Sequence, residues 1–106
     1  MIATADRQVT LEFKRRLEEI TTVLDVRAFG SRARGEAAPD SDLDVFVEVA
    51  SLTPALRRRI DEIAWEVGFE WDYIIVPVVV SRDELEHGPL AASPLILNIE
   101  REGVSL

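Results

Sequence analysis

The chain has 106 residues, of which 47% are apolar and 30% are charged, so we expect one soluble domain, residues 1–106, around a single hydrophobic core. The formal net charge of −8 opposes a phosphate backbone and argues against general nucleic-acid binding. The lack of cysteine excludes disulfides and cysteine-ligated zinc, and the lack of a long apolar run argues against a membrane partner. We therefore expect a cytoplasmic protein.

The first half of the chain predicts one helix and two strands. Apolar residues recur at a mostly helical period from Asp6 to Ile20, which predicts an amphipathic helix with one buried face. Val23–Phe29 is rich in β-branched and aromatic residues and predicts a strand that ends at Gly30. Apolar and polar residues alternate from Asp42 to Val49, which predicts a strand with one face on the core.

The next segment predicts a helix followed by a long strand. Thr53 can cap a helix whose first position is Pro54, and we expect Gly68 to stop that helix. The following run, Phe69–Val80, is largely apolar and predicts a strand. Pro77 within this run indicates an edge position or a bend, because proline donates no hydrogen bond to a neighbouring strand.

Two short helices complete the predicted order. Ser81 to Glu84 has the pattern of a capping box, and Ser93 precedes a proline that favours a helix start. Trp65 and Trp71 are expected in the core. The alternation of helices and strands predicts an α/β or α+β fold, in which a small sheet is covered by helices.

The acidic strand begins with two carboxylates that share a face. Asp42 and Asp44 are two residues apart, so their Cα atoms should lie about 7 Å apart on one side of the strand. Both can reach one Mg²⁺ ion, which prefers oxygen ligands and takes the remainder from water and phosphates. We expect Asp72 as a third ligand, because a charge without a role would be costly inside the apolar strand predicted there.

The loop before this strand combines flexible backbone with cationic side chains. Gly30 allows close backbone approach to a ligand, and Ser31 can add a hydroxyl hydrogen bond at the start of an expected helical turn. Arg32 and Arg34 are candidates for charge-assisted contacts with phosphates. The Gly-Ser-Arg segment alone is also typical of an ordinary turn, and the PDSDLD segment alone of a polar turn.

The stretch GSRARGEAAPDSDLDVFVEV, residues 30–49, resembles the signature of the polymerase-β-like nucleotidyltransferase superfamily. The segments GSRARG and SDLD are most similar to those of the minimal nucleotidyltransferase domains of prokaryotes. The C-terminal segment SPLILNIEREGVSL is also similar to the C-terminal sequences of those domains. The resemblance covers nearly the whole chain. It implies a small mixed β-sheet flanked by helices.

The resemblance also implies roles for individual residues. Gly30 and Ser31 correspond to the pair that binds nucleotide phosphates, Asp42 and Asp44 to the paired metal ligands, and Asp72 to a third carboxylate that helps to activate the acceptor hydroxyl. The implied reaction is Mg²⁺-dependent transfer of AMP from ATP to a hydroxyl, with release of pyrophosphate. The resemblance further suggests an antitoxin whose acceptor is a toxin of the HEPN ribonuclease family.

Two alternatives to a protein-modifying enzyme remain open. The chain could neutralise its partner by forming a complex with little catalysis, and its acidic surface would steer association with a basic ribonuclease. It could also transfer AMP to a small molecule such as an aminoglycoside, which would need a second domain or a dimer cleft. A homodimer through an exposed strand edge at Val78–Val80 is a further possibility.

Overall fold

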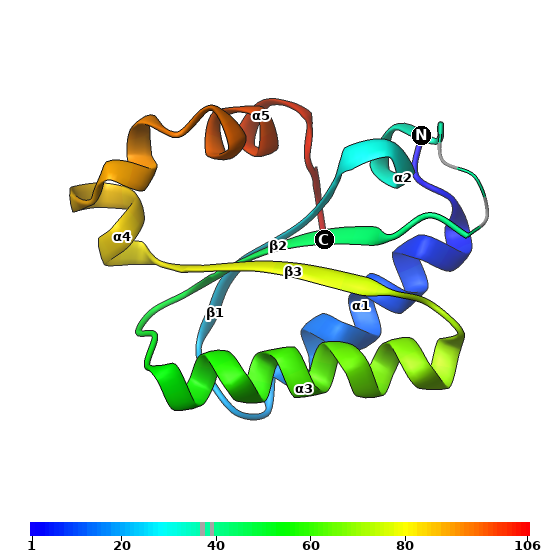
Figure 1. The fold of residues 1–106 in the computed structure, drawn as a ribbon, viewed down its shortest axis with the longest axis horizontal. Helices are drawn as coiled ribbons and strands as arrows, with labels where there is room; N and C mark the ends of the chain where they lie inside the picture. The colour runs from blue at the N-terminus through cyan, green and yellow to red at the C-terminus, as the bar shows by residue number, and fades with distance from the viewer. Residues whose placement is uncertain (37, 39) are drawn as a thin grey trace.

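The computed structural model describes residues 1–36, 38 and 40–106 (Figure 1). Its helices and strands follow the alternating order that the sequence predicts, with an added 3-10 helix and an added short strand at the end. The elements are α1 (Thr4–Glu18), β1 (Val23–Phe29), α2 (Gly30–Arg34), β2 (Leu43–Val49), α3 (Pro54–Trp71), β3 (Ile75–Ser81), α4 (Arg82–His87), η1 (Pro89–Ala92), α5 (Pro94–Glu102) and β4 (Val104–Ser105).

The described strands form one mixed sheet in the order β3-β2-β1-β4. β1 is antiparallel to β2 and to β4, whereas β2 and β3 run parallel. β3 is therefore an edge strand, as Pro77 predicted. The expected fold class, a small mixed sheet flanked by helices, is confirmed.

Helices cover both faces of the sheet (Figure 1). α1 and α3 lie on one side and form the main core with the alternate β2 residues that the sequence assigned to that face, namely Leu43, Val45, Val47 and Val49. On the other side, Ile96 and Ile99 of α5 pack with Phe46 and Val80. Each such side chain contributes about 1.5–3 kcal/mol when it is fully buried, so both layers help to fix the position of β2.

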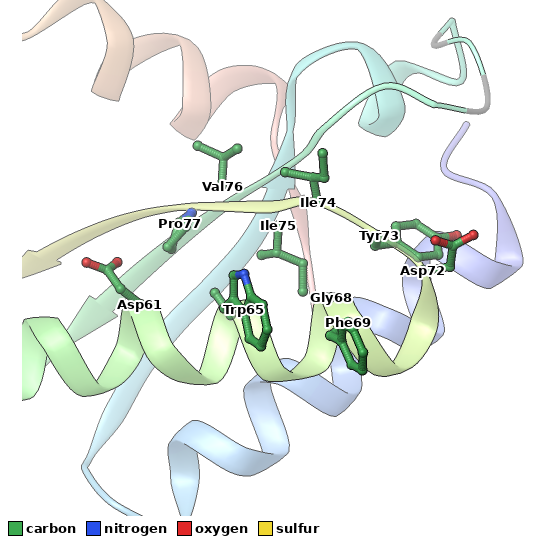
Figure 2. Close-up of a pocket in the computed structure, with 11 residues that line it drawn as sticks. Asp61, Trp65, Gly68, Phe69, Asp72, Tyr73, Ile74, Ile75, Val76 and Pro77 are labelled. Carbon is green, nitrogen blue, oxygen red and sulfur yellow. The ribbon is translucent and has the colours of Figure 1, made fainter.

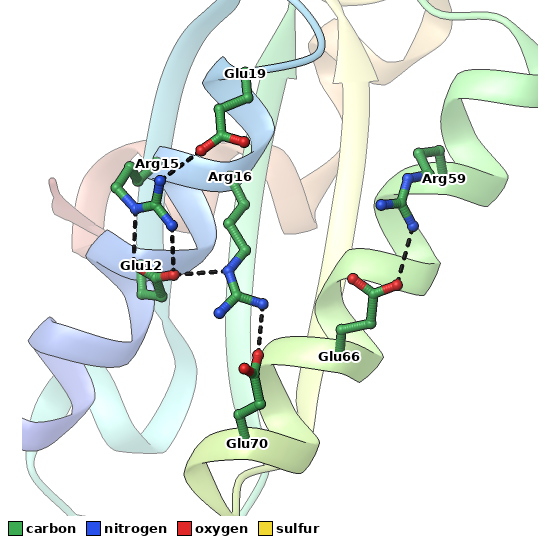
Figure 3. Close-up of polar contacts among 7 residues, drawn as sticks. All are labelled: Glu12, Arg15, Arg16, Glu19, Arg59, Glu66 and Glu70. Carbon is green, nitrogen blue, oxygen red and sulfur yellow. Dashed lines mark hydrogen bonds and ion pairs between the residues drawn. The ribbon is translucent and has the colours of Figure 1, made fainter.

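A polar network ties α1 to α3 outside this core (Figure 3). Glu12 accepts hydrogen bonds from Arg15 and from the Nε of Arg16, and Arg16 also donates to Glu70 of α3. These hydrogen bonds lower the pKa of Glu12 to about 2, with Arg15 the larger contributor and Arg16 the next. The network therefore favours an ionised Glu12 in the folded state.

The expected strand Phe69–Val80 is wrong in its first part, because α3 continues to Trp71 and β3 begins only at Ile75. Gly68 does not stop the helix. It lies inside α3, where a Cβ atom would stand 2.5 Å from the carbonyl oxygen of Tyr73, and its own oxygen accepts a hydrogen bond from the Tyr73 amide at 2.8 Å. Glycine is therefore needed for the close return of the chain after the helix.

Three smaller expectations also differ from the structure. Trp65 and Trp71 are exposed rather than core residues, because the buried face of α3 is formed by other positions, among them Ala64 and Val67. α1 is shifted two residues toward the N-terminus relative to the expected span. β4, which the sequence pattern did not predict, pairs with β1 next to Ala28. No helix of the described chain is long and apolar enough to cross a membrane.

Candidate active site

The structure brings the glycine of the Gly-Ser pair against the second aspartate of the acidic strand. Antiparallel pairing places Phe29, the last residue of β1, opposite Asp44 of β2. The chain then enters α2 at Gly30 with a φ of +76°, and a Cβ atom on Gly30 would stand 2.5 Å from Asp44 Oδ2. Both the backbone conformation and the contact with the carboxylate therefore require glycine.

Ser31 follows within α2, the short helix expected at this position. Ser31 is half-buried, and α2 has no side-chain cap at its start. The helix ends at Gly35, whose φ of +75° is the left-handed conformation that commonly terminates helices. The Gly30–Ser31 pair therefore stands at the end of β1, immediately beside the start of β2.

Asp42 and Asp44 flank Leu43 at the start of β2, and they differ in their surroundings. Asp42 is exposed, whereas Asp44 is half-buried. Burial raises the pKa of Asp44, and the nearby charge of Asp42 raises it further. A divalent cation would offset both effects, and carboxylate oxygens are the ligands that Mg²⁺ prefers. This pair therefore fits a Mg²⁺ ion.

Asp72 lies in a different environment from the one expected. It is the exposed residue that ends α3, with a φ of +59°, and it precedes β3 rather than lying inside it. Aspartate tolerates this left-handed conformation better than most residues. Asp72 lines a hollow together with Asp40 and Ser41, near the approach to β2.

The strand beside the aspartate pair offers no replacement. In the parallel register, Val76 lies opposite Asp44 and Val78 opposite Phe46, so the positions next to the acidic face of β2 are apolar. Within residues 1–36, 38 and 40–106, no three histidine, cysteine or carboxylate side chains lie close enough to hold one metal ion together. The structure thus places Asp42 and Asp44 side by side at the start of β2, and Asp72 outside that pair.

Arg32, one of the two candidates for phosphate contacts, makes several contacts with neighbouring elements. Its Nε donates to the carbonyl oxygen of Ser41 at 2.7 Å, its Nη1 donates to Asp6 Oδ1 at 2.9 Å, and its guanidinium lies over the ring of Tyr73. The Tyr73 hydroxyl donates to the same Asp6 oxygen at 2.6 Å. Arg34, the other candidate, is more exposed and pairs with Glu36.

This Asp6–Arg32–Tyr73 network is the part of the site that sequence reasoning missed. Asp6 is only 4% exposed although it is a charged residue in the first turn of α1. The network joins α1, α2, the loop before β2 and the segment before β3. Because a buried carboxylate with these partners is costly to disrupt, it fixes how the Gly-Ser turn meets the acidic strand.

A mixed sheet that places a Gly-Ser turn against paired aspartates is the arrangement that the sequence resemblance implies for a nucleotidyltransferase domain. The comparison with known families agrees, since residues 10–96 match the family model described as the nucleotidyltransferase domain. That match covers most of the chain, and the chain belongs to the nucleotidyltransferase domain family. No curated protein matches the chain significantly.

Solved structures share the same fold. A toxin–antitoxin complex with AMP-PNP is 19% identical, has a TM-score of 0.64, and is matched over 97% of this chain and 72% of its own. The tri-AMPylated HEPN toxin of Shewanella oneidensis in complex with an MNT antitoxin gives 17% identity, a TM-score of 0.56, and 95% and 67% coverage. A protein named as a minimal nucleotidyltransferase gives 28% identity, a TM-score of 0.58, and 96% and 90% coverage.

Proposed function

We propose that this chain transfers AMP from ATP to a hydroxyl of a partner protein, and that it acts in this way as the antitoxin of a HEPN-family toxin. The observation that carries the proposal is the contact between Gly30 and Asp44, which joins the two halves of the motif into one site. The similarity of the fold to MNT antitoxins crystallised with HEPN toxin or with AMP-PNP supports the choice of acceptor and nucleotide.

In this reaction the acceptor oxygen forms a bond to the α-phosphorus of ATP, the bond to pyrophosphate breaks, and the hydroxyl proton is released. Gly30 leaves room for backbone approach to the phosphates, and Ser31 offers a hydroxyl donor beside it. Asp42 and Asp44 would hold Mg²⁺. Bound there, the metal supplies positive charge that offsets the phosphates and favours attack by the acceptor.

The test is transfer of label from ATP to the product of the adjacent gene in the presence of Mg²⁺. We expect the wild-type chain to label that protein, and Asp42→Asn combined with Asp44→Asn to abolish the labelling. The matched control is Asp83→Asn combined with Glu86→Gln, which removes two exposed carboxylates of α4 and should label normally. Equal labelling by the Asp42/Asp44 variant would refute the assignment of these two residues.

A second function, neutralisation by complex formation alone, is favoured by one observation. Val76 and Val78 occupy the β3 positions beside the acidic face of β2, so the described site lacks a third carboxylate. A non-catalytic antitoxin would need only its binding surface. If the Asp42→Asn plus Asp44→Asn variant still neutralises the partner in full, the chain acts by binding, and transfer of AMP is not its protective step.

A further inference from the structure

An apolar groove runs between α3 and the edge strand β3, outside both packed layers (Figure 2). It has a volume of about 690 Å³. Trp65 and Phe69 of α3 form one wall, and residues 74–77 form the other. The Ile75 side chain points toward α3, whereas the side chains of Ile74 and Val76 point away from it (Figure 2). The groove is separate from the contact between Gly30 and Asp44 that carries the proposed transfer.

The walls of this groove expose large apolar side chains to an unusual degree. Trp65 is 70% exposed and Phe69 is 76% exposed, and their rings stack with centroids 5.4 Å apart. Contiguous apolar surface of this kind is typical of a site where another protein binds, and exposed tryptophan is enriched among residues that dominate binding energy.

The edge of β3 is poorly suited to pairing with another strand. Ile74 accepts a hydrogen bond from the Leu43 amide at 2.8 Å, so alternation along the strand turns the backbone groups of Pro77 and Val79 away from β2. Pro77 has no N–H to donate there, and the Val79 oxygen already accepts from Arg57 at 3.3 Å. An occupant of the groove must therefore bind mainly through side chains.

Charge at the two ends of the groove indicates the chemistry of that occupant. Asp61 lies at one end and Asp72 at the other (Figure 2), and both are exposed. Within the described part of the chain, neither side chain has an ion pair or a hydrogen bond with another residue. The two carboxylates are eleven positions apart along α3 and its end, which corresponds to about 16 Å at the helical rise.

We propose that the groove docks an amphipathic helix of the partner protein, whose apolar side packs on Trp65 and Phe69. Basic side chains about three helical turns apart would reach Asp61 and Asp72. A second copy of this chain fits less well, because each copy carries a net charge of −8 and would bring its own acidic surface to the acidic ends of the groove.

The position of the groove connects docking with transfer, and this step rests on the proposed function. Asp72 and Ile74 line both the groove and the hollow beside Ser41 at the approach to β2. Val76 lies on the groove wall and is also the residue in register with Asp44. A helix held in the groove would place the segment that follows it next to the aspartate pair.

The experiment measures binding of the product of the adjacent gene to purified full-length variants by titration calorimetry. We expect Trp65→Ser combined with Phe69→Ser to raise the Kd by at least about tenfold. Because both side chains are exposed, the circular dichroism spectrum should show no loss of folded structure. The matched control is Leu95→Ser combined with Leu97→Ser, two exposed apolar residues of α5 that should leave the Kd unchanged. Charge reversal by Asp61→Lys plus Asp72→Lys should also weaken binding.

The outcomes separate this proposal from the proposed function. Unchanged binding by the Trp65/Phe69 variant, or no binding by the wild type, overturns helix docking in the groove. A wild-type dimer in sedimentation that the same variant dissociates also overturns it and assigns the groove to a second copy. If binding depends on the groove but no label passes from ATP to the bound protein, docking stands and the proposed transfer fails.

Discussion

Replacing Gly30 with alanine tests the contact on which the candidate site depends. An alanine at a φ of +76° costs about 1–2 kcal/mol from the left-handed conformation alone. The new Cβ would also stand 2.5 Å from Asp44 Oδ2, so the carboxylate must move away. Gly30→Ala should therefore both lower the free energy of unfolding and displace one of the two proposed Mg²⁺ ligands.

Gly35 offers a matched control, because it has nearly the same backbone conformation without the same neighbour. Its φ is +75°, and an added Cβ would meet the backbone of Met1 rather than Asp44. Urea unfolding should show both alanine variants destabilised by at least about 1–2 kcal/mol. Transfer of label from ATP should fall strongly in Gly30→Ala and stay close to wild type in Gly35→Ala, compared well below both unfolding midpoints.

Two results would contradict this reasoning. Full transfer activity in Gly30→Ala would mean that the close approach to Asp44 is not needed for the reaction. Equal loss of activity in both variants would mean that loss of stability, rather than displacement of the carboxylate, explains the effect.

Two carboxylates should change stability with pH in opposite directions. Burial, and then the charge of Asp42, raises the pKa of Asp44 above 3.8, so the ionised form is disfavoured in the folded state. Asp44→Asn should therefore increase the free energy of unfolding, measured with urea at pH 7 in metal-free buffer. This gain in stability should shrink as the pH falls through the raised pKa toward 3.8. Hydrogen bonds from Arg15 and then Arg16 lower the pKa of Glu12 from 4.5 to about 2 (Figure 3). Glu12→Gln should lower the free energy of unfolding above pH 4.5, and its difference in stability from the wild type should diminish toward pH 2. An opposite trend for either variant would refute the corresponding pKa shift.

The start of the acidic strand could be predicted because local pattern determines it. Strict alternation over Asp42–Val49 places one set of side chains on the core in a single register, and β2 buries Leu43, Val45 and Val47 on that face. The helix start at Thr53 was equally predictable, because threonine is a preferred capping residue. In the structure its side chain accepts a hydrogen bond from the Leu56 amide.

The position of Asp72 could not be predicted, because a contact outside the local pattern decides it. Gly68 looked like a helix stop, yet its missing side chain makes room for the Tyr73 carbonyl and lets α3 continue to Trp71. The apolar residues after Gly68 then belong partly to an exposed helix face. Local periodicity does not distinguish such a face from a strand when the run is short.

The role of Asp6 depends on partners that are distant in sequence. It meets Arg32 and Tyr73, which are 26 and 67 positions away. Helical periodicity records which side of α1 is apolar, but it carries no information about a buried charge with remote partners. Arg32 was therefore assigned to phosphate on the basis of its loop, whereas the structure engages it with α1.

The most direct test of the central proposal follows which phosphorus of ATP reaches the partner. The wild-type chain, Mg²⁺ and the product of the adjacent gene are incubated in parallel with ATP labelled at the α-phosphate and with ATP labelled at the γ-phosphate. Nucleotidyl transfer predicts label on the partner from the α-position only, and its loss in the Asp42→Asn plus Asp44→Asn variant. Label from the γ-position, or α-label that persists in that variant, would contradict the proposed reaction at this site.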